Sequence, residues 1–200
     1  MSSRRGPSSI GRTGLVYHEA MLTHETGPSH PEQPARIQVC LERLKDEDVL
    51  SKLKLLTPAP ASPGQIGWVH PQAYIQKVQD FAAHGGFFNS DTPVSPHSFE
   101  AASLAAGGII KAVDEILTSR LNNAFCLVRP PGHHATATQA MGFCFFNNLA
   151  IGVKNAQRVH QISRVLILDW DAHHGNGLQD IFFEDMFASP TRSQHIKLLQ

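Results

Sequence analysis

The segment 167–177, ILDWDAHHGNG, places two carboxylates and two imidazoles within six residues, at the end of the apolar run VLIL. The apolar run has the composition of a buried strand. Because side chains alternate along a strand, Asp169, Asp171 and His173 can all point the same way if the strand continues. Ionisable groups at the end of a buried strand are costly without partners, so this segment is a first candidate for a functional site.

A second polar cluster, RPPGHH (129–134), follows a second apolar run, AFCLV (124–128). Apolar residues that recur at helical spacing predict helices over 34–45, 71–83, 95–118 and 146–158 and another that begins near Leu178. Apolar strands that alternate with helices predict an α/β fold with a parallel β-sheet flanked by helices on both faces. Ligands bind at the carboxyl ends of such strands, so the two clusters are expected to meet in one site.

Further local patterns add to this outline. LVY (15–17) is a short apolar run that predicts a strand, whereas TPAPASPG (57–64) is a loop by its Pro and Gly content. Gly107 and Gly108 interrupt the longest predicted helix. Glycine lowers helix propensity, so the pair indicates that this helix packs closely against neighbouring backbone.

The composition excludes several classes of protein. The chain has 200 residues, 42% of them hydrophobic and 17% charged, which is typical of a globular domain. Its net charge is zero, and its apolar runs are too short for a membrane span, so neither direct nucleic-acid binding nor a membrane is expected. Residues 1–14 lack the apolar core of a secretory signal and are expected to form a flexible leader. Organelle targeting stays open.

The chemistry of the two clusters favours a metal. Asp171 and His173 offer oxygen and nitrogen ligands without a thiolate, which suits a catalytic Zn²⁺, although iron(II) would also fit. His133 and His134 could move a proton near the metal, and Asp169 could accept the N–H of one of these rings. The three cysteines are widely spaced and form no CxxC pair, which favours reduced thiols in an intracellular protein.

Three segments, RPPGHHA, GFCFFNN and LDWDAHHGNG, together resemble the zinc-dependent histone deacetylases, especially class II, and the related acetylpolyamine amidohydrolases. HPEQPAR, VHPQAYI and the AAGG helix match in the same order, so the resemblance covers roughly residues 15–187. It implies an arginase/deacetylase-like fold and hydrolysis of an ε-N-acetyl-lysine amide to lysine and acetate.

The resemblance also implies roles for individual residues. Asp171 and His173 would be zinc ligands, and His133 and His134 would be the tandem histidines beside the water that zinc activates. Asp169 would be the carboxylate behind His133 and, with Asp171 and the His173 backbone, would surround a structural K⁺.

Other matched residues would form the second histidine's partner and the substrate contacts. Asn176 stands behind the second histidine, as in class II-like members. Asp91 matches a rim carboxylate that holds the substrate backbone, and Gly142 and Phe143 match the wall of the acetyl-lysine tunnel. Arg36 matches an arginine of the inner cavity. No role is expected for eight other histidines: His18, His24, His30, His70, His84, His97, His160 and His195.

The sequence departs from the family near its C-terminus. The family's third zinc ligand, an Asp, and its oxyanion-stabilising Tyr lie past residue 200, and 188–200 is a divergent tail. The chain is therefore expected to form the N-terminal part of the deacetylase domain only and to be inactive by itself. An acetylpolyamine or other small-amide deacetylase, and a truncated isoform that acts only through binding, are the alternatives.

The absence of a long insertion favours lysine in proteins, histone or other, over a polyamine substrate. Co-repressor-type partners and a role in chromatin and transcription regulation are implied by the resemblance alone. The same holds for a nuclear or cytoplasmic location.

Overall fold

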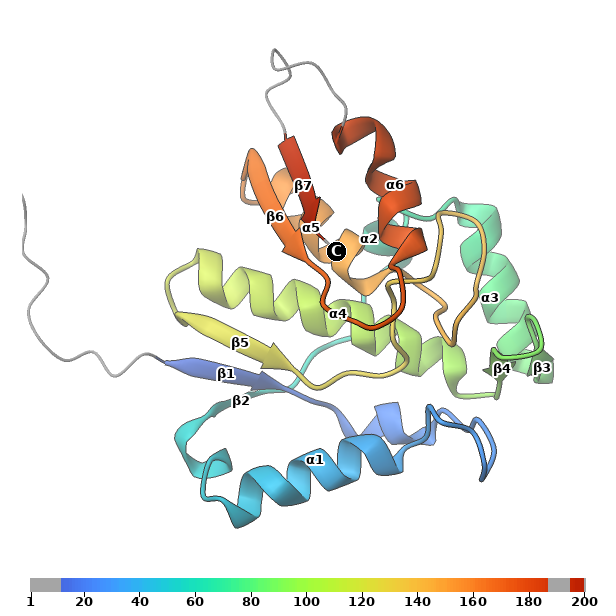
Figure 1. Cartoon of the computed structure of the whole chain (residues 1–200), viewed down its shortest axis with the longest axis horizontal. Coiled ribbons are helices and arrows are strands. Elements are labelled where there is room, and N and C mark those ends of the chain that lie inside the picture. Colours follow the sequence, from blue (N-terminus) through green and yellow to red (C-terminus); the bar gives the residue numbers. More distant parts are fainter. Residues whose placement is uncertain (1–11, 187–194, 200) are drawn as a thin grey trace, which may run out of the picture.

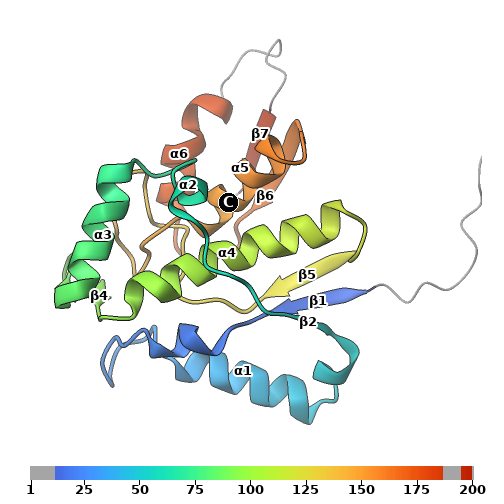
Figure 2. The same ribbon diagram turned by 180° about the vertical axis from the view of Figure 1, so that it is seen from behind.

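The computed structural model describes residues 12–186 and 195–199 (Figures 1 and 2). The helices are α1 (Ala35–Asp46), α2 (Pro63–Ile66), α3 (Gln72–His84), α4 (Ser98–Leu117), α5 (Asn148–Arg158) and α6 (Asn176–Met186), with 3-10 turns η1 (Glu19–Thr23) and η2 (Leu50–Lys52). The strands are β1 (Thr13–Val16), β2 (Lys54–Leu56), β3 (Gly86–Phe87), β4 (Pro93–Val94), β5 (Asn123–Cys126), β6 (Arg164–Leu168) and β7 (His195–Leu199).

A three-stranded parallel sheet, in the order β2-β1-β5, forms one part of the fold. Leu15 of β1 packs with Ile37 of α1, and Val16 packs with Ala112 of α4. Neighbouring residues of β1 therefore bury their side chains under different helices, one on each face of the sheet (Figure 1). The predicted α/β fold, a parallel sheet flanked by helices, is confirmed.

A second parallel pair, β6-β7, forms the other part. Ile167 and Ile196 of this pair pack against Leu178 and Phe182 of α6 and against Val153 of α5. α4 contacts β1, β5 and α5, so it joins the two sheets (Figure 2). β7 lies within 188–200, the segment predicted only as a divergent tail. Residues 188–194 and 200 of this tail lie outside the described part of the chain.

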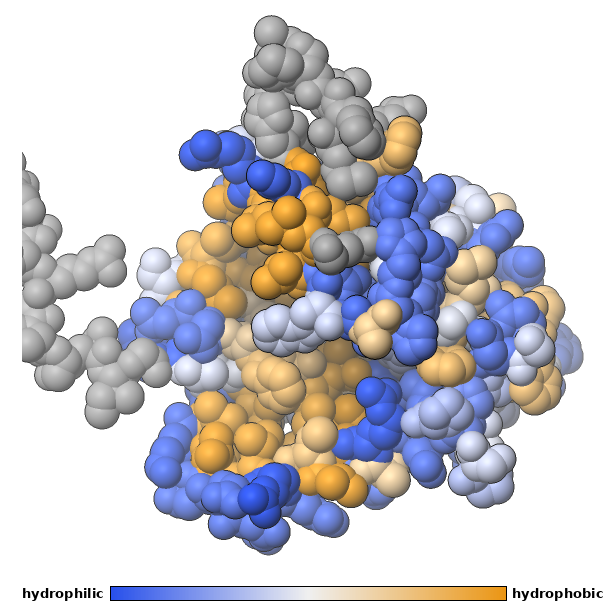
Figure 3. All heavy atoms as spheres, viewed as in Figure 1, coloured by the Kyte–Doolittle hydropathy of each residue, from blue (hydrophilic) through white to orange (hydrophobic). Residues whose placement is uncertain are grey.

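The strands β5 and β6 are less buried than their apolar sequences predict. Leu166 and Leu168 are 60% exposed and Phe125 is 53% exposed. Within the described residues, β6 pairs only with β7 and β5 only with β1, so each strand has an open edge. Figure 3 shows apolar residues gathered over both sheets around a hollow on this face. The buried strand that the apolar run VLIL predicts is therefore exposed at Leu166 and Leu168 within the described residues.

Helix starts and the Gly-Gly pair show how local sequence sets the fold. α5 begins at Asn148 rather than at Phe146, because the Asn147 side chain accepts the Ala150 N–H and caps the helix. A Cβ at Gly107 would lie 2.0 Å from the carbonyl oxygen of Ala59, so the expected close packing of α4 is confirmed.

The N-terminal leader is described only from residue 12. Residues 1–11 lie outside the described part, whereas Thr13 and Gly14 already belong to β1, so the strand begins inside the expected leader 1–14. None of the helices in the described part is long and apolar enough to cross a membrane.

Candidate active site

Both polar clusters line one cavity of about 380 Å³. Eight of the predicted site residues line it: Arg36, Asp91, His133, His134, Gly142, Phe143, Asp171 and His173. Three further residues that the sequence reading did not select complete the lining, namely Pro31, Glu32 and Pro131. The two clusters therefore lie in one site, as the sequence predicts. The roles of the individual residues stay predictions.

The tandem histidines have different partners behind them. His133 Nδ1 lies 2.9 Å from Asp169 Oδ2, and His134 Nδ1 lies 2.7 Å from Asn176 Oδ1. Because both acceptors are oxygens, each ring donates from Nδ1, and a neutral ring then has its lone pair at Nε2. The ring centroids are 4.0 Å apart, so two oriented proton acceptors stand side by side.

Glycines allow α6 to pack against the histidine loop. A Cβ at Gly177 would lie 2.3 Å from the Ala135 carbonyl oxygen. The Leu178 N–H donates to the His133 carbonyl. This contact sets the first turn of α6 against the loop, which is why Asn176, the first residue of α6, stands behind His134.

A buried ion pair holds the histidine loop from the other side. The Arg129 guanidinium donates to both carboxylate oxygens of Glu32, at 3.0 and 2.9 Å, and to the carbonyls of Met21 and His24. Arg129 and Glu32 are each 1% exposed, so breaking the pair would leave an uncompensated buried charge. This ion pair was not predicted from the sequence. The available hint was that each residue stands next to a proline in a family-like segment, Glu32 in HPEQPAR and Arg129 in RPPGHHA.

Asp171 and His173 lie together at the open side of the cavity, with side chains 49% and 78% exposed. Asp171 Oδ1 accepts the His173 backbone N–H at 2.8 Å and lies 3.0 Å from His173 Nδ1. The backbone N–H of His173, and then its ring, hold the pKa of Asp171 below its usual range. A carboxylate and an imidazole side by side are donors that suit zinc.

The metal set is incomplete within the described residues, where no three His, Cys, Asp or Glu side chains are grouped to hold an ion. Asp169 Oδ1 accepts the Asp171 N–H at 3.2 Å, so Asp169, Asp171 and His173 share one turn of the chain. The K⁺ role of this turn stays a prediction.

Gly142 and Phe143 form the two central residues of a tight turn. The Met141 and Cys144 backbones exchange hydrogen bonds, and φ is +54° at Gly142 and +69° at Phe143, as in a type I′ turn. A Cβ at Gly142 would lie 2.3 Å from His134 Cδ2, so only glycine lets the turn lie against that ring.

Arg36 lies at the cavity with a 61% exposed side chain, and its Nη1 donates to Glu32 Oε1 at 3.4 Å. Asp91 is exposed at the rim. The roles that the resemblance implies for Arg36 and Asp91 stay predictions.

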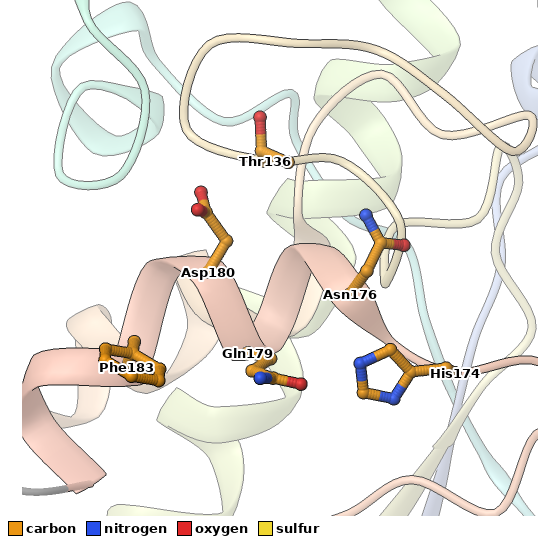
Figure 4. A pocket seen from close by; sticks show the side chains of 6 residues that line it. All are labelled: Thr136, His174, Asn176, Gln179, Asp180 and Phe183. Carbon is orange, nitrogen blue, oxygen red and sulfur yellow. The ribbon is translucent and has the colours of Figure 1, made fainter.

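A second hollow, of about 530 Å³, lies behind the histidine pair. Figure 4 shows it beside α6, with Gln179, Asp180 and Phe183 on the helix and Thr136 on the loop opposite. Asn176 and His174 also line it. His174 therefore lines a different hollow from its neighbour His173, which makes it a matched control in experiments on the candidate metal ligands.

His70, to which the sequence reading gave no role, supports the site loop from inside. The ring is fully buried, its Nδ1 lies 3.1 Å from the Ala137 carbonyl, and its Nε2 accepts the Asn147 N–H at 2.9 Å. Asn147 in turn donates to the Ala135 carbonyl. Burial lowers the pKa of His70 to about 4.

This burial predicts a pH-dependent stability. Between an unfolded pKa of about 6.5 and the folded pKa of about 4, the unfolded chain binds more protons at His70. The free energy of unfolding should therefore fall as pH is lowered through this window, by about 2 kcal/mol from this residue. Urea unfolding at pH 7 and pH 4.5 should show a smaller pH dependence for His70→Gln than for the wild type. His84→Gln, at an exposed site, should match the wild type; an unchanged dependence in His70→Gln would contradict the role.

A parallel α/β fold whose strand ends converge on a cavity lined by histidines and carboxylates has its ligand site where α/β proteins bind ligands. The sequence model of the histone deacetylase domain matches residues 30–193. The chain belongs to the histone deacetylase family.

Three relatives illustrate the similarity. A probable deacetylase of Archaeoglobus fulgidus is 41% identical over 175 residues, which cover 86% of this chain and 48% of that protein. Human polyamine deacetylase HDAC10 is 37% identical over 198 residues, 92% of this chain and 29% of that protein. The crystal structure of the HDA15 HD domain superimposes with a TM-score of 0.85 at 34% identity, covering 95% of this chain and 54% of that one. The chain thus spans about half or less of the length of the curated relatives.

Proposed function

We propose that this chain contributes zinc ligands, proton-transfer groups and the substrate rim to a deacetylase that hydrolyses N-acetyl-lysine amides in proteins. The observation that supports it best is the pairing of His133 with Asp169 and of His134 with Asn176 beside Asp171 and His173 in one cavity. Family membership supports the reaction class.

Asp171 and His173 are the residues that would hold zinc. Zinc, when bound, supplies a Lewis acid that polarises the amide carbonyl and lowers the pKa of a water molecule. Asp169 would remain the candidate for the K⁺ contact, together with Asp171 and the His173 backbone.

The two histidines would divide the proton transfers. The partner of His134 is a neutral amide, so its Nε2 is suited to take the proton of the attacking water. The partner of His133 is a carboxylate, which can balance a positive ring charge, so His133 is suited to an electrostatic role or to protonating the leaving amine. Arg36 would face the acetate side of the cavity, and Asp91 would hold the substrate backbone.

A small-amide deacetylase is the second candidate, because one relative is a polyamine deacetylase. The rim carboxylate of Asp91 at the cavity favours the protein substrate.

The choice is tested with a version of the chain extended to the complete deacetylase domain, called the full-length protein below. Its acetate release is measured from an acetyl-lysine peptide and from an acetylated polyamine. The proposal expects a kcat/KM at least about tenfold higher for the peptide, since the rim contacts are available only to it. Preference for the polyamine would support the second candidate, and no release from either would contradict both. Residues 1–200 alone should release no acetate, because the described residues offer two ligands where a catalytic zinc takes three.

A further inference from the structure

The mouth of the cavity contains a strained residue. Phe143 occupies the second central position of the Met141–Cys144 turn at φ +69°, a conformation that a bulky side chain adopts only when its surroundings hold it there. The contacts that hold Phe143 therefore decide where its ring stands at the cavity wall.

Thr92 supplies the first of these contacts. Its hydroxyl, on a fully buried residue, accepts the Phe143 N–H at 3.2 Å and donates to the Asp91 carboxylate at 2.7 Å. One hydroxyl thus connects the wall residue to the rim residue. It occupies one oxygen of the Asp91 carboxylate.

His30 supplies the second contact. Its Nε2 lies 3.1 Å from the Asp91 carbonyl, while its Nδ1 lies 3.1 Å from Glu32 N and 3.2 Å from Glu32 O. A neutral ring that donates from Nε2 accepts the Glu32 N–H at Nδ1. The ring also meets the Phe143 ring edge-on, with centroids 4.7 Å apart and an interplanar angle of 76°.

We propose that His30 and Thr92 are positioning residues of the cavity mouth, which set the places of the Asp91 carboxylate and the Phe143 ring. Neither residue lines the cavity, yet together they close a ring of contacts through Asp91 and Phe143. Their effect falls on substrates that reach the rim. This last step rests on the proposed function.

Kinetics of the full-length protein test that effect with two substrates, an acetyl-lysine peptide and N-butylacetamide, which has the amide but no peptide backbone. Thr92→Val and His30→Phe should raise KM for the peptide about 5- to 30-fold. They should leave kcat within about twofold and lower kcat/KM for N-butylacetamide, which meets the Phe143 wall but not the Asp91 rim, by less than about threefold. Thr92→Ser and His30→Gln, which keep a hydroxyl and an N–H donor, should recover most of the peptide KM. An unchanged peptide KM, or equal losses with both substrates, would overturn the proposal.

Amide hydrogen exchange supplies a readout that needs no turnover. In Thr92→Val the Phe143 amide should exchange at least about tenfold faster, because it loses its acceptor. The Cys144 amide, which donates to Met141 O at 2.9 Å within the same turn, should keep its wild-type rate. If the wild type hydrolyses neither substrate, the proposed function fails while this measurement still decides the positioning role. Unchanged exchange at Phe143 would overturn that role.

Discussion

Asp171→Ala and His173→Ala should each abolish stoichiometric zinc binding by the full-length protein. The two side chains lie side by side at the cavity, with Asp171 Oδ1 3.0 Å from His173 Nδ1, so one ion can contact both. Loss of either leaves a catalytic zinc with fewer protein ligands than the usual three. Metal analysis of purified variants after dialysis should give about one zinc per chain for the wild type and far less for both variants.

His174→Ala is the matched control, because this neighbouring imidazole lines the other hollow. It should bind zinc like the wild type. Retention of one zinc per chain by both Asp171→Ala and His173→Ala would refute the ligand assignment.

His134→Ala should lower kcat by about 10²- to 10⁴-fold with zinc still bound, and His133→Ala by a smaller factor. The reason is that Asn176 and Asp169 fix the Nδ1 sides of the two rings, which leaves the Nε2 sides for proton transfer. Single-turnover rates and zinc content, measured on the same samples, check both statements. His97→Ala should turn over like the wild type, and wild-type kcat in both site variants would exclude the role.

Much of the site was predictable because its signals are local. An apolar run followed at once by Asp169, Asp171 and His173 indicates a strand end with ionisable groups, and 129–134 repeats the pattern. The parallel α/β fold follows from the alternation of such runs with helices. Because ligands bind at the carboxyl ends of strands in such folds, the meeting of the two clusters could be predicted without coordinates, although the structure places β5 and β6 in separate sheets.

The parts that were missed depend on contacts between distant segments. Arg129 finds Glu32 across 97 residues and His30 finds Asp91 across 61, and neither pairing has a spacing that a sequence pattern can report. The short strands β2 and β7 depend on their neighbours rather than on propensity. The exposure of Phe125 in β5 and of Leu166 and Leu168 in β6 was missed for the same reason, since burial of an apolar strand depends on what lies beside it.

Zinc-edge anomalous scattering from crystals of the full-length protein tests the central claim most directly, namely that Asp171 and His173 hold a catalytic zinc beside the histidine pair. The predicted result is one peak within about 2.0–2.2 Å of an Asp171 oxygen and a His173 nitrogen, facing His133 and His134. A fully loaded zinc held elsewhere in the protein, with no density between these two side chains, would contradict it.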